Sequence, residues 1–166
     1  MNVELLETVR QAILYRPKRF CAAQWAFARN ANEVVHDGDN PQQFKCCIAG
    51  HVLLESGTYS VPKLLQRGGF HSDGHPWEEA GTVLGLTEEQ WRELFFPSQW
   101  DKPYKQDYYL SGREEEAEIA ASYIDHFISK HADAASREAP AIEAPTEDAT
   151  TLQALEPDAS GQRVEA

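Results

Sequence analysis

The stretch that most constrains the fold of this chain is Phe44 to Gly57, FKCCIAGHVLLESG, which has almost no polar face on a helical wheel. A helix that is apolar nearly all round is buried, so this stretch predicts a central helix with others packed around it. Gly50 lies in its middle and predicts the point where a neighbouring helix backbone approaches. Gly57 is placed to adopt the left-handed conformation that ends a helix.

Capping residues and apolar spacing predict further helices around this one. Thr87 with Gln90, and Ser111 with Glu114, have the spacing of capping boxes, in which side chains bond the first amides of a helix. We expect an irregular loop over residues 30–41 and an irregular aromatic segment over residues 97–110. The expected surrounding helices run from Asn2 to Pro17, Arg19 to Arg29, Ser60 to Gln66, Pro76 to Gly85, Thr87 to Pro97 and Ser111 to His131.

These patterns predict a mostly α-helical domain over residues 1–131, a compact bundle of about five to six helices around the central apolar helix, with irregular loops. Residues 132–166 differ in composition, because they hold no aromatic residue and have eight acidic residues against two arginines. Such a segment buries too little apolar surface to offset its chain entropy. The sequence therefore predicts a disordered acidic tail.

The formal net charge of the chain is -12. Because nucleic acids and anionic membranes are themselves negative, this charge argues against direct binding to either, and it favours another protein with a basic surface as partner. Three cysteines do not form a secreted disulfide framework. No run is apolar enough to span a bilayer, and the amino terminus lacks the features of a signal peptide. We expect a soluble cytoplasmic protein.

The segment 97–110, PSQWDKPYKQDYYL, carries Trp100, Tyr104, Tyr108 and Tyr109. Two interpretations are open. Trp100 and one or two of the tyrosines could clamp the segment across the core. Alternatively, the four rings could form a binding surface, since Trp and Tyr are enriched at interfaces.

Cys47 and His51 lie four residues apart, which places a thiol and an imidazole on one side of the central helix. A neighbouring His lowers the pKa of a thiol and makes it nucleophilic, so the pair is a candidate for thiol catalysis. Catalysis also needs solvent access and a third group that orients the imidazole. The apolar surroundings instead favour packing, with Cys47 as a small apolar side chain and His51 hydrogen-bonded to a loop carbonyl or carboxylate.

His71, Asp73 and His75 form a candidate metal site, with further donors at residues 36–39. Imidazole and carboxylate groups bind zinc and similar ions. Their spacing follows no zinc-finger, metalloprotease or EF-hand pattern, and turn formation alone explains the Asp and Gly residues. No cofactor is predicted.

Several motifs of the chain occur together: CIAGH at 47–51, Ala80, LGLT at 84–87, LF at 94–95, Pro97, Trp100 and YIDHF at 123–127. In these residues the chain resembles a family of small bacterial and phage proteins with a CIAG-type helix and an LGL-(S/T)-x-x-(Q/E) segment. Many members carry Cys-Gly-Thr where this chain has Gln42, Gln43 and Phe44, so the resemblance does not imply a functional cysteine pair. The resemblance implies a helical domain, and it supplies no activity that could be carried over to this chain.

The sequence favours a non-enzymatic protein that binds or regulates another macromolecule. The alternative is a thiol- or metal-dependent enzyme that uses either Cys47 with His51, or His71 with Asp73 and His75. Metal analysis and thiol labelling separate the two hypotheses.

Overall fold

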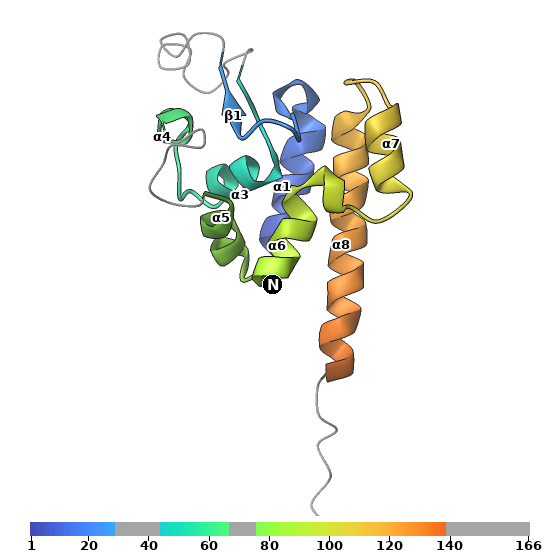
Figure 1. Cartoon of the computed structure of the whole chain (residues 1–166). Coiled ribbons are helices and arrows are strands. Elements are labelled where there is room, and N and C mark those ends of the chain that lie inside the picture. The colour runs from blue at the N-terminus through green and yellow to red at the C-terminus, as the bar shows by residue number, and fades with distance from the viewer. Residues whose placement is uncertain (29–43, 67–75, 139–166) are drawn as a thin grey trace, which may run out of the picture.

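The computed structural model describes residues 1–28, 44–66 and 76–138, and for residues 133–138 only the backbone. The described residues are mostly helical, as predicted, with seven α-helices, two 3₁₀ helices and two very short strands (Figure 1). In this part of the chain, no helix is long and apolar enough to cross a membrane. The elements are α1 (Val3–Tyr15), η1 (Pro17–Arg19), β1 (Ala26–Phe27), β2 (Lys45–Cys46), α3 (Ile48–Glu55), α4 (Val61–Gln66), α5 (Pro76–Leu84), α6 (Glu88–Phe95), η2 (Pro97–Gln99), α7 (Tyr104–Leu110) and α8 (Glu116–Glu138).

The first helix, α1, begins where the sequence predicts. The side chain of Asn2 accepts a hydrogen bond from the Leu5 amide at 3.1 Å and so caps the helix. Its apolar stripe, Leu6, Val9 and Ile13, is fully buried. Because α1 contacts both α3 and α8, it joins the central helix to the long carboxy-terminal one.

The central helix, α3, is shorter than predicted. The expectation of a helix from Phe44 is wrong, because Lys45 and Cys46 form strand β2 and Cys47 caps α3 with an extended backbone. A short apolar run is compatible with a buried strand or a buried helix, and periodicity alone does not separate them. From Ile48 onward the prediction is confirmed, since the first six residues of α3 are buried and the helix contacts α1, α4, α5 and α6.

Of the two glycines predicted to shape the central helix, Gly57 has the expected role, and Gly50 lies at a close approach as expected, but not of a helix. Gly57 adopts a φ of 73° just after α3, and its amide bonds the Leu54 carbonyl at 3.0 Å. A Cβ at Gly50 would lie 2.7 Å from Cys46 Cβ and 3.0 Å from the Trp25 carbonyl oxygen. The close approach is therefore real, but the neighbour is the β1–β2 region rather than a helix.

The expected short helix over Arg19–Arg29 is also wrong. In the described part of this segment the chain leaves η1, turns, and forms β1. The large side chains still pack, because Phe20 and Trp25 are buried while Phe27 is exposed. The strands β1 and β2 are antiparallel, with Ala26 opposite Cys46 and Phe27 opposite Lys45.

The pair α5 and α6 follows the sequence closely. Gly85 ends α5 with a φ of 65°. Thr87 and Gln90 form the predicted capping box, in which each side chain accepts a hydrogen bond from the backbone amide of the other residue. A Cβ at Gly81 would lie 2.5 Å from the Trp91 ring, so the two helices touch at this glycine.

The segment over residues 97–110 is more regular than predicted, because it contains η2 and helix α7. No residue of α7 is fully buried, so the helix lacks the apolar stripe that would have predicted it. Ser111 ends α7 instead of starting the last helix, which begins at Glu116 and continues past His131 to Glu138. Figure 1 shows α7 alongside α8. Of the disordered tail expected over residues 132–166, residues 132–138 continue α8. The rest of that tail and the loop expected at 30–41 lie outside the described residues.

Candidate functional site

The candidate thiol–imidazole pair is buried, with Cys47 2% and His51 4% exposed. The direct bond between the two residues is the helical one, from the His51 amide to the Cys47 carbonyl oxygen at 3.0 Å. Burial raises the pKa of the Cys47 thiol to about 11. Burial, together with the positive charge of Arg19, lowers the pKa of His51 to about 4. Both groups are therefore neutral near pH 7, and a neutral thiol is a weak nucleophile.

The expected hydrogen bond from His51 to a loop carbonyl or carboxylate is not formed within the described residues, where both of its ring nitrogens are buried without a partner. The backbone of Arg19 lies near enough to favour the protonated ring slightly, without completing a hydrogen bond. This imidazole is unusual, since most buried polar groups are hydrogen-bonded.

The candidate metal ligands His71, Asp73 and His75, and the donors at 36–39, lie outside the described residues. Among the side chains that are described, no group of three or more His, Cys, Asp or Glu is arranged to hold a metal ion.

Three of the four aromatic residues singled out from the sequence serve packing. Trp100 is 3% exposed, and its indole N–H donates to the Leu94 carbonyl at 3.0 Å. The indole stacks on the ring of Tyr123 at a centroid distance of 4.6 Å. Tyr104 meets Tyr123 edge-on, and Tyr108 meets Trp100 in the same way, each at 5.5 Å. The clamp interpretation fits these three rings.

The fourth ring, Tyr109, is 60% exposed at the end of α7, and the next residue, Leu110, is 86% exposed. Beside them a groove of about 420 Å³ runs between α7 and the start of α8. We call it the acidic groove, because carboxylates supply half of its six lining residues. They are Asp107, Leu110, Ser111, Glu115, Glu118 and Ile119.

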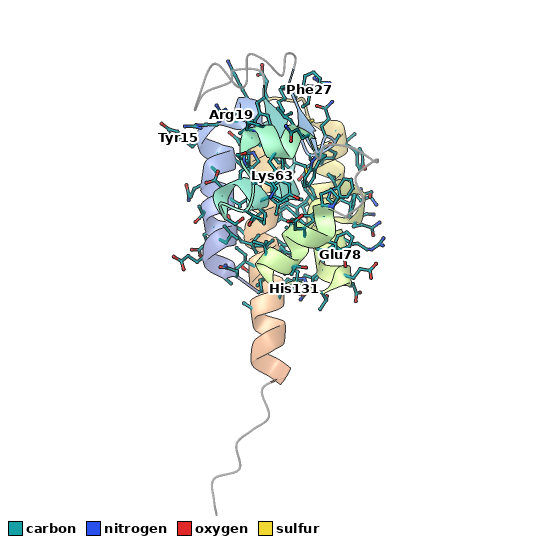
Figure 2. The ribbon with its side chains drawn as sticks, turned by 90° about the vertical axis from the view of Figure 1, so that its left-hand side faces the viewer. Tyr15, Arg19, Phe27, Lys63, Glu78 and His131 are labelled. Carbon is teal, nitrogen blue, oxygen red and sulfur yellow. The ribbon has the colours of Figure 1, made fainter. Side chains whose placement is uncertain are left out.

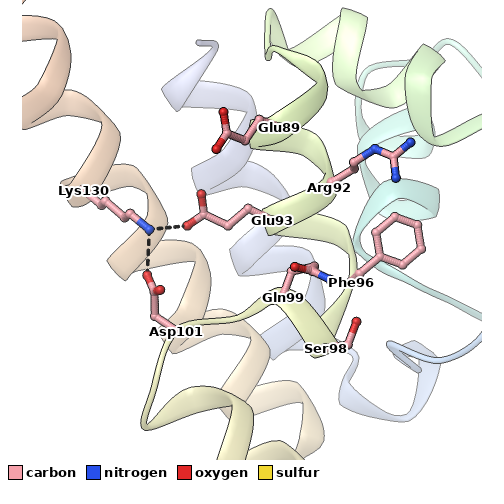
Figure 3. Close-up of a pocket in the computed structure, with 8 residues that line it drawn as sticks. All are labelled: Glu89, Arg92, Glu93, Phe96, Ser98, Gln99, Asp101 and Lys130. Atoms are coloured by element: carbon pink, nitrogen blue, oxygen red, sulfur yellow. Dashed lines mark hydrogen bonds and ion pairs between the residues drawn. The ribbon is translucent and has the colours of Figure 1, made fainter.

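A larger hollow of about 600 Å³ lies between α6, the segment after it, and α8 (Figure 3). We call it the charged pocket. Lys130 joins its two sides, with Nζ 2.7 Å from a Glu93 oxygen and 2.8 Å from an Asp101 oxygen. Hydrogen bonding from Lys130 holds the pKa of the Asp101 carboxyl below its usual value, and the pKa of Lys130 is raised in return. The charged pocket is lined by Glu89, Arg92, Glu93, Phe96, Ser98, Gln99, Asp101 and Lys130.

The carboxylate of Glu93 is the centre of this network. It also accepts from the Tyr123 hydroxyl at 3.2 Å and lies 3.1 Å from His131 Nε2. The capping box engages the Gln90 oxygen, so the Gln90 amide nitrogen faces His131 Nδ1 at 3.3 Å. In neutral His131, Nδ1 therefore accepts and Nε2–H donates to Glu93. Glu93 is thus satisfied by its neighbours, and the arrangement fastens α6 to α8 instead of presenting a free acid or base.

Sequence reasoning missed both the acidic groove and the charged pocket. Glu93 and Lys130 are 37 residues apart, and no local pattern links them. The one signal for the groove in the sequence is Leu110, an apolar residue that follows Tyr109 and is followed directly by Ser111 and Gly112.

Comparison of the chain with protein families, with curated proteins and with solved structures found no match. The resemblance to small bacterial and phage proteins stays a prediction.

Proposed function

We propose that this protein is a non-enzymatic binding protein that holds a basic, partly apolar segment of another protein in the acidic groove. The observation that carries the proposal is a groove with three carboxylates whose lining includes Leu110, which is 86% exposed and follows the 60% exposed Tyr109 in the chain. Large apolar side chains exposed beside a hollow are typical of interaction sites.

The composition of the groove defines the kind of segment that would occupy it. Leu110 and Ile119 offer apolar contact, while Asp107, Glu115 and Glu118 surround them with negative charge. A segment with Lys or Arg on either side of a Leu, Ile or Met side chain complements both features. Nucleic acid lacks this complementarity, because its phosphates would meet carboxylates in a chain of net charge -12.

The alternative of a thiol enzyme has weaker support. Cys47 and His51 are buried and neutral near pH 7, and within the described residues no third group orients the imidazole. The alternative of a metal enzyme depends on His71, Asp73 and His75, which lie outside the described residues.

The test is calorimetric titration of the full chain with a short synthetic peptide of lysine and leucine. The double variant Glu115→Lys/Glu118→Lys should bind it about thirtyfold more weakly at low salt. Each reversal replaces an attraction of about 0.5 kcal/mol by a similar repulsion, so the two together cost about 2 kcal/mol.

The matched control is Glu4→Lys/Glu7→Lys. These two exposed carboxylates have the same spacing of three residues, and Glu4 lies in the first turn of α1 as Glu118 does in α8. The net charge changes equally in both variants. Equal loss of binding in the two would show that the peptide responds to overall charge and not to the groove, and the proposal would be wrong.

A second variant tests the apolar part of the site. Leu110→Ser removes a side chain that is 86% exposed, so the fold should keep its stability. Burial of a leucine in a complex contributes about 1.5 to 3 kcal/mol, so the peptide should bind at least tenfold more weakly. A peptide in which serine replaces leucine should not distinguish this variant from the wild type.

A further inference from the structure

A separate hollow of about 370 Å³ lies between α1 and α3, on a different part of the domain from the acidic groove. We call it the α1–α3 pocket. Tyr15 and Arg19, both of which line it, lie near the carboxy-terminal end of α1 (Figure 2). Its volume is within the range of sites for small molecules, at the lower end.

The first reason to consider this pocket a binding site is His51, which forms part of its wall. The imidazole is 4% exposed, and within the described residues neither ring nitrogen has a hydrogen-bond partner. A neutral imidazole offers one donor and one acceptor. Burying the donor and the acceptor without partners is unfavourable. The other buried residues of α3, from Ile48 to Leu53, are apolar or glycine and fill the core without burying an unpaired polar group. A ligand in the pocket would supply the missing partner.

The second reason is charge. Arg16 and Arg19 both line the pocket, and residues 16–19, RPKR, form a basic run in a chain of net charge -12. Arg19 already has an interaction within the folded chain, so a ligand would share this cation. Arg16 is exposed, with its guanidinium 5.6 Å from the Tyr15 ring. A guanidinium group can donate two parallel hydrogen bonds to two oxygens of one carboxylate or phosphate group.

The third reason is the apolar part of the wall, to which Ala12, Phe44 and Leu54 contribute. This apolar wall complements a ligand in which an apolar part is attached to the anionic group that the arginines would bind. Glu55 also lines the pocket and disfavours a ligand with negative charge at more than one end.

We propose that the α1–α3 pocket binds a small organic anion, with a carboxylate or phosphate group held by Arg16 and Arg19, an apolar body against Ala12, Phe44 and Leu54, and a hydrogen bond to His51. The inference is independent of the acidic groove. Either site could be present without the other, and the variants that test them are different.

The experiment is a titration of the full, isotope-labelled chain followed by NMR of the histidine ring nitrogens and of the backbone amides. The probes are benzoate, phenyl phosphate and the uncharged benzamide. Benzoate or phenyl phosphate should shift the His51 ring signals and the Ala12 and Leu54 amides in a saturable way, and the stronger of the two identifies the anionic group. No saturable shift at His51 with either anion, up to the solubility limit of the probes, would overturn the proposal. Benzamide shifts equal to those of the anions would do the same.

Four variants separate binding from folding. Ala12→Leu fills the pocket without removing a polar group and should abolish the benzoate shifts, whereas Ala23→Leu, at an exposed turn residue, should leave them intact. Arg16→Gln should weaken benzoate binding about tenfold with an unchanged melting temperature. His51→Leu should melt higher than the wild type without ligand and should lose the rise in melting temperature that benzoate gives the wild type. Wild-type affinity in Ala12→Leu would contradict the assigned position of the ligand.

Discussion

Replacing His51 by leucine should change how the stability of the protein depends on pH. The folded chain holds this imidazole 4% exposed, and burial together with the charge of Arg19 lowers its pKa from 6.5 to about 4. The unfolded chain therefore takes up a proton as the pH falls below about 6.5, while the folded chain does not do so until about pH 4. Protonation thus favours the unfolded state between these two values.

The magnitude follows from the size of the shift. Each pH unit between the two pKa values lowers the free energy of unfolding by about 1.4 kcal/mol, so His51 should cost the wild type about 3 kcal/mol between pH 7 and pH 4. Above pH 6.5 this contribution is constant. The His51→Leu variant lacks this pH-dependent contribution to the free energy of unfolding. The variant should also be about 1 to 3 kcal/mol more stable than the wild type at pH 7, because it removes a buried polar group that has no partner.

The assay is urea unfolding of the wild type and the variant, followed by fluorescence of the four tryptophans, at several values between pH 7 and pH 4. The difference in free energy of unfolding between the two proteins isolates the histidine, because the other titrating groups are common to both. His126→Leu is the matched control. His126 has a partner, with Nε2 3.1 Å from an Asp101 oxygen, so its removal should destabilise the protein at pH 7. A difference between wild type and His51→Leu that stays constant with pH would show that the pKa of His51 is not lowered in the folded chain.

Three further predictions concern packing, the thiols and the charged pocket. Gly50→Ala should destabilise the protein by about 1 to 3 kcal/mol in urea unfolding, because its Cβ has no room beside the β1–β2 region. Gly112→Ala, where a Cβ meets nothing within 4 Å, should be close to neutral. A thiol reagent should modify the partly exposed Cys21 in the native protein and Cys47 only on unfolding, and rapid native labelling of Cys47 would revive the thiol-enzyme alternative. Glu93→Gln should lower stability by about 1 to 3 kcal/mol, since three side chains hydrogen-bond to this carboxylate, and a smaller loss at low salt would contradict the network.

Local signals in the sequence predicted the parts of the fold that depend on neighbouring residues. The Asn2 cap, the capping box of Thr87 with Gln90 and the glycine ends of two helices are all set within a few residues, and the structure confirms them. The extended backbone at Lys45 and Cys46 is different. It depends on pairing with β1, nearly twenty residues earlier in the chain, which an apolar run does not encode.

The candidate sites likewise combine features that neighbouring residues determine with features that only the packing of the fold determines. The sequence showed that Cys47 and His51 share one side of the central region, but only the packing shows that the thiol is neutral and that the imidazole has no partner in the described residues. The exposure of Tyr109 depends on how α7 lies against α8, a contact between two helices that no local sequence pattern encodes. The groove beside it has the same origin, since its two walls come from different helices.

The most direct test of the proposed function is the NMR map of the full chain saturated with the lysine–leucine peptide. We predict that the largest amide shifts fall on Tyr109, Leu110 and Ile119, and that the amide signals of residues around the charged pocket, such as Glu93, shift little. Shifts spread evenly over the acidic surface, or centred on the charged pocket, would contradict the assignment of the acidic groove as the binding site.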